Sequence, residues 1–261
     1  MNFETLQLEQ YDKDILIITL NRPQIHNAIN TDMRNELYQL WKFLKKNPKK
    51  LRCVIITGAG DTFCAGADLK ERKHITLTAW KDQLTVLRKA IITMLECPIP
   101  VISAVNGAAY GGGLEIILAS DFAYAADTAI FAQSEVKWGI MPGALGTQHL
   151  PRACGLRRAK ELTFTGQSFT AKEAFHWGII NKICESHQLL SDVLTTAKTI
   201  CANAPLAIQQ IKKSLNTTQQ LSIKTGYHFE LKAYHRLLLT KDREEGIKAF
   251  NEKRKPFFIG E

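Results

Sequence analysis

The sequence predicts an α/β protein in which a layered core of strands and helices is followed by a helical C-terminal region. Short apolar, β-branched runs alternate with helix-spaced segments through the first two-thirds of the chain, and from residue 156 onward the spacing becomes helical. Hydrophobic residues make up 45% and charged residues 23% of the 261 residues, which is a globular composition. We therefore expect a core over residues 1–200 and a helical region over residues 201–261.

The N-terminal segment predicts two paired strands and a helix. Residues 3–9 alternate in character and residues 14–20 read DILIITL, so both favour strands joined by a tight turn. Asn30 or Thr31 is a capping residue for a helix that follows, whose apolar residues recur at helical spacing until residue 47.

Two further apolar runs, residues 51–57 and 101–105, are typical of buried parallel strands. Each leads into a glycine-rich segment, and the second follows a helix that should end near residue 97. Helical spacing then predicts a series of helices in the rest of the chain, at residues 114–119, 156–164, 171–177, 189–203, 206–215, 222–239 and 242–253.

Charge is distributed unevenly along the chain. The 34 basic residues exceed the 25 acidic ones, for a net charge of +9, which favours polyanionic partners. Between Lys89 and Lys137, however, there is no lysine or arginine, although five carboxylates are present. This pattern predicts an acidic functional centre within the core and a basic periphery.

Glycine-rich segments follow both buried strands. Residues 63–69 read FCAGADL, and residues 106–115 read NGAAYGGGLE. Three consecutive glycines at a helix start expose peptide N–H groups, which suit a phosphate or an oxygen that becomes negative during a reaction. The spacing matches neither the dinucleotide fingerprint nor the P-loop, so a polarised carbonyl oxygen fits better. A tight surface loop is the plain alternative for residues 63–69.

Glu115 and Glu135 are the candidate acid and base. They lie 20 residues apart, which suits two neighbouring elements that converge in space. Two such carboxylates can divide acid and base duties when their surroundings separate their pKa values. Taken singly, each carboxylate is more often a solvated or salt-bridged group.

Other features limit the function classes. The first fourteen residues lack the pattern of a secretory signal, and no stretch has the roughly 20 apolar residues that span a bilayer. The six cysteines contain no CxxC pair, so we expect no metal site and a reducing, cytoplasmic location. Basic residues 42–52 leave a nucleic-acid-binding protein as a non-enzyme alternative, but no aromatic stacking platform accompanies them.

Several of these motifs together resemble the enoyl-CoA hydratase/isomerase (crotonase) family, in the family's order and over nearly the whole chain. The resemblance is carried by Asn21-Arg22-Pro23, His26-Asn27-Ala28, residues 63–70, Asn106-Gly107, Gly111-Gly112-Gly113-Leu114-Glu115, Ser134-Glu135, Pro142-Gly143, Gly146-Thr147-Gln148 and residues 250–254.

The resemblance implies a spiral of ββα units with a helical C-terminal trimerisation region, assembled as a homotrimer or homohexamer. It implies a lyase of fatty acid β-oxidation that hydrates 2-enoyl-CoA and needs no cofactor beyond the coenzyme A of its substrate. The N–H groups of Ala67 and Gly112 would form the oxyanion hole, Glu115 would act on the attacking water, and Glu135 would protonate the α-carbon. Isomerisation and dehydration of a hydroxyacyl-CoA stay open as alternatives on the same scaffold.

The resemblance also implies a coenzyme A and substrate path. Its residues are Arg22, Ala28, Ala65, Gly66, Ala67, Asp68, Leu69, Lys70, Gly111, Gly112, Pro142, Gly143, Lys253 and Arg254. The basic triplet at residues 253–255 could grip phosphates, or it could be a solvated helix end. Two departures from the family pattern, Leu145 and His149, concern the size of the acyl pocket; Leu145 could narrow the pocket or pack in the core.

Overall fold

Two sheets organise the computed structural model, which describes residues 2–48, 51–218 and 221–261. The larger sheet has the strand order β1-β2-β3-β5-β7-β10, in which only β1 and β2 run antiparallel. The smaller has the order β4-β6-β8-β9, with β8 and β9 antiparallel. The strands are β1 (Leu6–Tyr11), β2 (Ile15–Leu20), β3 (Cys53–Gly58), β4 (Thr62–Cys64), β5 (Val101–Val105), β6 (Ala108–Tyr110), β7 (Phe122–Ala126), β8 (Ile130–Ala132), β9 (Ser168–Thr170) and β10 (Lys182–Cys184).

Consecutive strands divide between the two sheets in a repeated way. In the pairs β3/β4, β5/β6 and β7/β8, the first strand joins the larger sheet and the second joins the smaller one. Helices follow the pairs, namely α2 (Leu69–Arg72) and α3 (Leu77–Leu95) after β4, and α4 (Gly112–Ala119) after β6. The chain therefore winds as successive ββα units, which confirms the α/β spiral that the resemblance implies.

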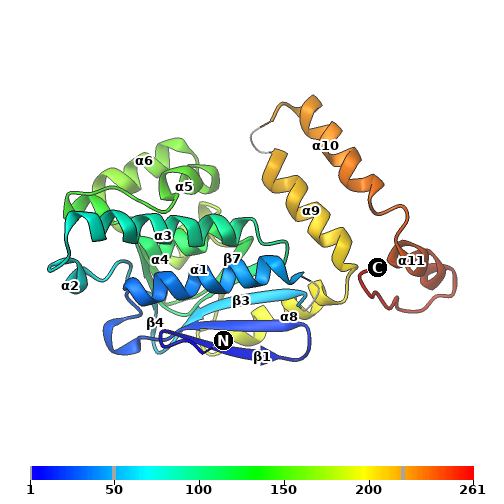
Figure 1. Ribbon diagram of the computed structural model, residues 1–261, viewed down its shortest axis with the longest axis horizontal. Helices are drawn as coiled ribbons and strands as arrows, with labels where there is room; N and C mark the ends of the chain where they lie inside the picture. Colours follow the sequence, from blue (N-terminus) through cyan, green and yellow to red (C-terminus); the bar gives the residue numbers. More distant parts are fainter. Residues whose placement is uncertain (1, 49–50, 219–220) are drawn as a thin grey trace.

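The larger sheet has a hydrophobic core on each face. Val54 and Ile56 of β3 pack in one cluster with α1 (Thr31–Lys46), α3 and α4, whereas Cys53 and Ile55 pack in another with α8 (Leu189–Cys201). This alternation is the two-residue period of a strand buried on both faces. Figure 1 shows α1 and α3 side by side over one face of the sheet, with α8 on the other.

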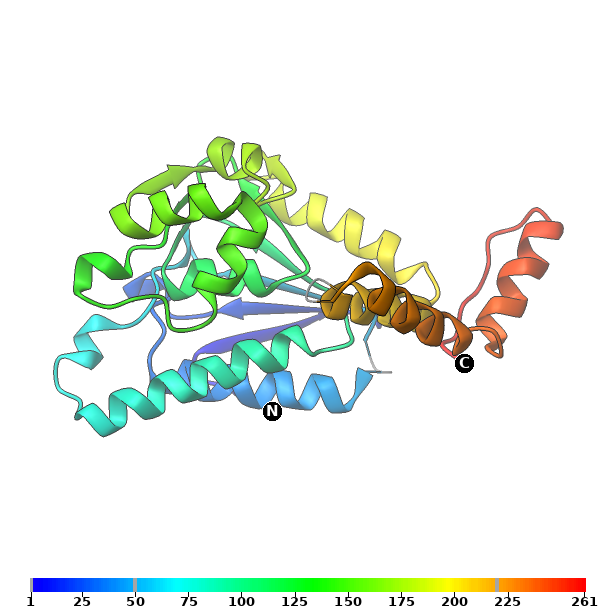
Figure 2. The ribbon, with the colours of Figure 1, turned by 90° about the horizontal axis from the view of Figure 1, so that it is seen from above.

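Helices α5 (Gly146–Cys154), α6 (Leu156–Thr165) and α7 (Ala171–His176) complete the core, and three more helices extend beyond it. These are α9 (Pro205–Thr218), α10 (Ile223–His235) and α11 (Lys241–Asn251). Together with the described segments that join and follow them, we call these helices the C-terminal arm. Both views show α9 and α10 side by side and α11 farthest from the sheets (Figures 1 and 2). Lys212 ties α9 to the core through a 2.7 Å ion pair with Asp121.

Most of the long elements predicted from the sequence are present, with shifted ends. The strand expected at residues 3–9 begins only at Leu6, because the preceding N–H groups of Glu4 and Thr5 donate to the Glu36 carboxylate on α1 instead of entering the ladder. The helix expected at residues 222–239 ends at His235. Asn30 caps α1, accepting a 3.0 Å hydrogen bond from the Met33 N–H, as predicted.

None of the described helices is both long enough and apolar enough to cross a membrane.

Candidate active site

A cavity of about 170 Å³ lies where the loop after β4, the start of α4 and the segment around residues 134–143 meet. It contains both glutamates singled out in the sequence and both glycine-rich segments. Its lining residues are Ala65, Gly66, Ala67, Leu69, Arg72, Leu84, Leu87, Tyr110, Gly111, Gly112, Glu115, Ser134, Glu135, Trp138, Ile140, Met141 and Gly143.

Glu115 is a buried carboxylate in the first turn of α4, only 3% exposed. Its Oε1 accepts hydrogen bonds from the N–H groups of Ala144 (2.7 Å) and Gly146 (2.8 Å), which leaves Oε2 without a hydrogen bond among the described residues. Burial, reinforced by the nearby charge of Glu135, raises the pKa of Glu115 to about 7, although the two N–H bonds oppose this shift. The side chain is therefore held in one place and titrates near neutral pH.

Glu135 begins the short helix η3 (Glu135–Trp138) on the other side of the cavity. Both of its carboxylate oxygens lie near Nε2 of Gln133, at 2.9 and 3.0 Å. Burial raises the pKa of Glu135 too, while the hydrogen bond from Gln133 lowers it. Because two like charges in one cavity disfavour joint ionisation, the pair can hold a single proton around neutral pH.

The backbone around Glu135 and Glu115 leaves room only for glycine at two positions. Gly111 has φ +49°, and a Cβ there would lie 3.0 Å from Oε1 of Glu135. A Cβ on Gly146 would lie 3.0 Å from Oε1 of Glu115. Both distances are tighter than ordinary contacts, so these glycines let the backbone approach the carboxylates closely.

Two peptide N–H groups in the cavity have no acceptor among the described residues. A parallel bridge joins Ile29 to the loop after β4 through the hydrogen bonds Ile29 N–H to Gly66 and Asp68 N–H to Ile29, which flank Ala67 and leave its own N–H unpaired. The N–H of Gly112, at the start of α4, is likewise unpaired. Both residues line the cavity, so two free donors lie in the same space as the two glutamates.

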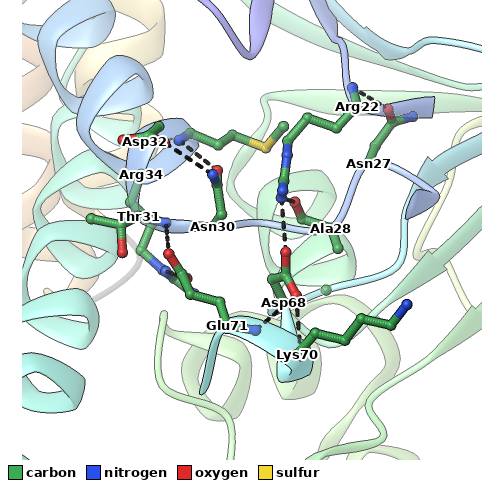
Figure 3. A network of polar contacts seen from close by, with 12 residues as sticks. Arg22, Asn27, Ala28, Asn30, Thr31, Asp32, Arg34, Asp68, Lys70 and Glu71 are labelled. Atoms are coloured by element: carbon green, nitrogen blue, oxygen red, sulfur yellow. Dashed lines mark hydrogen bonds and ion pairs between the residues drawn. The ribbon is translucent and has the colours of Figure 1, made fainter. Parts of the chain in front are cut away.

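Arg22 and Asp68, both expected on the coenzyme A path, form a pair with each other instead of lining the cavity. Arg22 Nη1 lies 3.1 Å from the Asp68 carboxylate and 2.6 Å from the carbonyl oxygen of Ala28 (Figure 3). Asp68 also caps α2, accepting from the N–H groups of Lys70 and Glu71. This network fixes the loop that carries Ala67.

Seven of the other residues predicted for substrate binding do line the cavity: Ala65, Gly66, Leu69, Gly111, Gly143 and, as donors, Ala67 and Gly112. The side chain of Lys70 is exposed on α2 outside it. Ala28 and Pro142 are partly buried beside the lining segments.

Lys253 and Arg254 follow α11, a helix that lies on the opposite side of the chain from α2 (Figure 1). Arg254 is paired with Glu245 at 2.6 Å and Glu252 at 2.7 Å. Within one chain these residues are therefore not brought to the cavity, and any contact of theirs with coenzyme A would come from another subunit of an assembly.

Leu145 has its own structural role. It adopts the left-handed conformation with φ +76° and packs against the main hydrophobic cluster, and it is not among the described residues that line the cavity. Of the two alternatives, narrowing the pocket or packing in the core, the structure favours packing.

Arg72 is a cavity residue that the sequence reasoning missed, as are the apolar residues Leu84, Leu87 and Met141. It is only 8% exposed, and its guanidinium lies 4.5 Å from the centroid of the Trp80 ring. Burial lowers its pKa, and the surrounding glutamates oppose that shift. A basic residue in a short helix ordinarily indicates a solvated position, so only the three-dimensional arrangement identifies it.

The described residues hold no cluster of His, Cys, Asp and Glu that could bind a metal ion.

Comparison with known proteins gives one consistent result. Residues 10–261 match the family model described as enoyl-CoA hydratase/isomerase. The chain is 39% identical over 250 residues to a putative enoyl-CoA hydratase/isomerase of Bacillus subtilis, covering 95% of this chain and 96% of that protein. It is 38% identical over 258 residues to the short-chain-enoyl-CoA hydratase of Clostridium acetobutylicum, covering 98% and 97%. A crystal structure of enoyl-CoA hydratase from Bacillus anthracis superposes with a TM-score of 0.96 at 37% identity, covering 99% of this chain and 100% of that one.

Proposed function

Because the chain belongs to the enoyl-CoA hydratase/isomerase family, we propose that it is an enoyl-CoA hydratase, which adds water across the 2,3 double bond of a 2-enoyl-CoA thioester. The observation that carries this proposal is the meeting of Glu115 and Glu135 with two unpaired N–H donors in one cavity. The proposal is supported by relatives that are named enoyl-CoA hydratase and that match this chain over nearly their whole length.

The thioester oxygen is proposed to accept hydrogen bonds from the N–H groups of Ala67 and Gly112. Attack at the β-carbon moves negative charge onto this oxygen, giving an enolate. Each fixed donor aimed at such an oxygen contributes about 3 kcal/mol to stabilising the transition state. Since both donors belong to the backbone, their positions depend on the Asp68 network and on the glycines at 66 and 111.

The two glutamates are proposed to divide the proton transfers. Glu115, whose Oε1 is fixed by two N–H bonds, takes a proton from water as the oxygen bonds to the β-carbon. Glu135 delivers a proton to the α-carbon. One proton leaves water and one reaches carbon, so the pair ends with the same number of protons that it started with.

Side chains at and around the cavity would hold the rest of the substrate. Trp138 and Met141 are largely exposed at the cavity and would contact the acyl or pantetheine chain. Lys70, Lys253 and Arg254 are proposed contacts for the coenzyme A phosphates, the last two only within an assembly. Fatty acid β-oxidation and a cytoplasmic location remain part of this proposal.

A homotrimer or homohexamer is proposed as the assembled form. The C-terminal arm exposes large apolar side chains that a single chain leaves uncovered, which is typical of surfaces buried on association. The most exposed are Ile211, Leu215, Ile223, Tyr227, Tyr234, Leu239, Phe250 and Phe257.

Product analysis tests the reaction. The protein is incubated with 2-enoyl-CoA and 3-enoyl-CoA thioesters of short, long and branched chains. We expect 3-hydroxyacyl-CoA from the 2-enoyl substrates. A shifted double bond without incorporation of water would identify an isomerase instead, and no consumption of any thioester would contradict the proposal.

A further inference from the structure

Arg72 is a buried cation at the cavity whose guanidinium contacts the Trp80 ring but makes no direct ion pair with the surrounding glutamates. It is more than nine-tenths buried and lines the cavity, and its side chain has neither a hydrogen bond nor an ion pair with any described residue. Its Nε is buried and unpaired. Buried charges are normally paired, because leaving water without a counter-ion is unfavourable. The partner of Arg72 is therefore to be sought in a ligand.

The short helix α2 holds Arg72 in place. Its neighbour Glu71 accepts from the N–H of Thr31 at 3.0 Å, from Arg34 at 3.3 Å and from Gln83 at 3.0 Å. Figure 3 shows Glu71 pointing back toward α1, while Asp68 caps the other end of the same turn. With both flanking carboxylates fixed, and its guanidinium against Trp80, Arg72 is oriented rather than freely mobile.

The surroundings of Arg72 exclude the two catalytic glutamates as its direct partners. Glu115 is bonded to Ala144 and Gly146, and Glu135 to Gln133, and neither lies within ion-pair distance of Arg72. The neighbouring walls of the cavity include Leu84 and Leu87, which suit the methylenes of an acyl chain. An arginine that lines such a cavity and has no direct ion pair suits a carboxylate, which it can bind through two parallel hydrogen bonds.

We propose that Arg72 binds a carboxylate carried by the acyl group, so that the preferred substrate is an enoyl-CoA with an acidic acyl chain. This inference rests on the proposed function only in taking the cavity as the acyl site. It makes Arg72 a specificity-determining residue and assigns it no part in the proton transfers.

The test measures binding of glutaryl-CoA and valeryl-CoA by calorimetry. Both are saturated five-carbon thioesters that cannot be hydrated, and they differ by the terminal carboxylate. We expect the wild-type protein to bind glutaryl-CoA more tightly. Arg72→Met should weaken glutaryl-CoA binding about 100-fold, as truncation of a buried charge pair does, and leave valeryl-CoA binding within a few-fold. The affinity of Arg72→Lys for glutaryl-CoA should fall between those of the wild-type protein and Arg72→Met. Lysine keeps the positive charge but lacks the planar guanidinium that forms two parallel hydrogen bonds.

Lys73→Met is the matched control, since it removes the same charge from the adjacent, exposed position directly after α2. It should leave both affinities unchanged. Equal affinity of the wild-type protein for the two thioesters would overturn the inference even if Arg72→Met failed to fold. A loss of affinity in Arg72→Met that is equal for both thioesters would overturn it as well. Because neither acyl chain has a carbon–carbon double bond, this outcome is independent of whether the protein hydrates enoyl-CoA.

Discussion

At the scale of single residues, Glu115 shows how the proposed chemistry and stability oppose each other. Its carboxylate is almost fully buried, and only two N–H bonds compensate for the lost water. The raised pKa of Glu115 shows that these two bonds do not fully offset the cost of burying the ionised carboxylate. A group that titrates near pH 7 suits acid–base chemistry, but its ionised form weakens the folded state.

We expect Glu115→Gln to stabilise the protein above neutral pH. Below a pH of about 4.5 the carboxyl is protonated in both the folded and the unfolded chain, so the substitution has little effect. As pH rises to about 7, the unfolded chain loses this proton while the folded chain keeps it, and wild-type stability falls. A difference of about 3 kcal/mol should therefore separate variant and wild type at pH 8.

Urea unfolding at pH 4.5 and pH 8, at one protein concentration, measures this difference. Glu9→Gln on β1 is the control, because it makes the same change at an exposed position. A variant no more stable than wild type at pH 8 would contradict the burial argument.

The residue scale also shows what sequence could predict of the site. Glu115, Glu135 and the glycine-rich segments stand out in sequence because their chemistry and order are distinctive, and the structure brings them into one cavity. Arg72 and the pairing of Arg22 with Asp68 do not stand out. Burial and pairing depend on which distant segments meet, and sequence spacing carries no such information.

At the scale of elements, the one-turn helix α2 places several functional groups at once. Asp68 caps it, Glu71 ties it to α1, and Arg72 projects from it toward the cavity. So short a helix has little stability of its own, and these contacts replace the missing length.

Asp68→Ala should therefore weaken both folding and catalysis. Removing the cap and the pairing with Arg22 should lower stability by about 2 kcal/mol and displace the neighbouring N–H of Ala67. Asp68→Asn keeps a capping oxygen but loses the charge, so it should recover about half of the stability. Urea unfolding measures the effect on stability, and kcat/KM measures the effect on catalysis. An Asp68→Ala variant with wild-type kcat/KM would contradict the claim that the Asp68 network positions the Ala67 N–H.

The length of a helix or strand largely determines whether it could be predicted from the amino-acid sequence. Helices such as α1 and the strands β2, β3 and β5, of five or six residues, are long enough to show their period, and all were predicted. The five-residue strand β7 and the nine-residue helix α5 were missed. Every strand of the smaller sheet has three residues, too few for a period, and each is fixed by pairing with segments distant in sequence. The smaller sheet was therefore not predicted from the residues, and only the family resemblance implied it.

At the scale of the whole molecule, the C-terminal arm has apolar side chains that a single chain does not cover. Ile223 and Leu239 are 92% and 93% exposed, in a chain whose core is otherwise well covered. Lys253 and Arg254, which follow α11 in the arm, do not line the cavity of the same chain. Both observations favour an assembly in which arms contact neighbouring subunits.

Light scattering should give a mass of three or six times the 29.3 kDa of one chain. Leu239→Asp should shift the protein toward smaller species, because it would place a charge in an apolar interface. Leu77→Asp, an equally drastic change at an exposed leucine outside the arm, should not. A wild-type monomer at micromolar concentration would rule out the assembly.

The central claim is that two glutamates in one cavity hydrate an enoyl-CoA, and substitution of each one tests it most directly. Hydration of a 2-enoyl-CoA is followed by loss of the absorbance of its conjugated double bond, in the wild-type protein and in Glu115→Gln and Glu135→Gln. Each variant should lower kcat by about 100-fold to 10,000-fold while leaving the affinity for a saturated acyl-CoA nearly unchanged. Wild-type turnover in both variants would contradict the account.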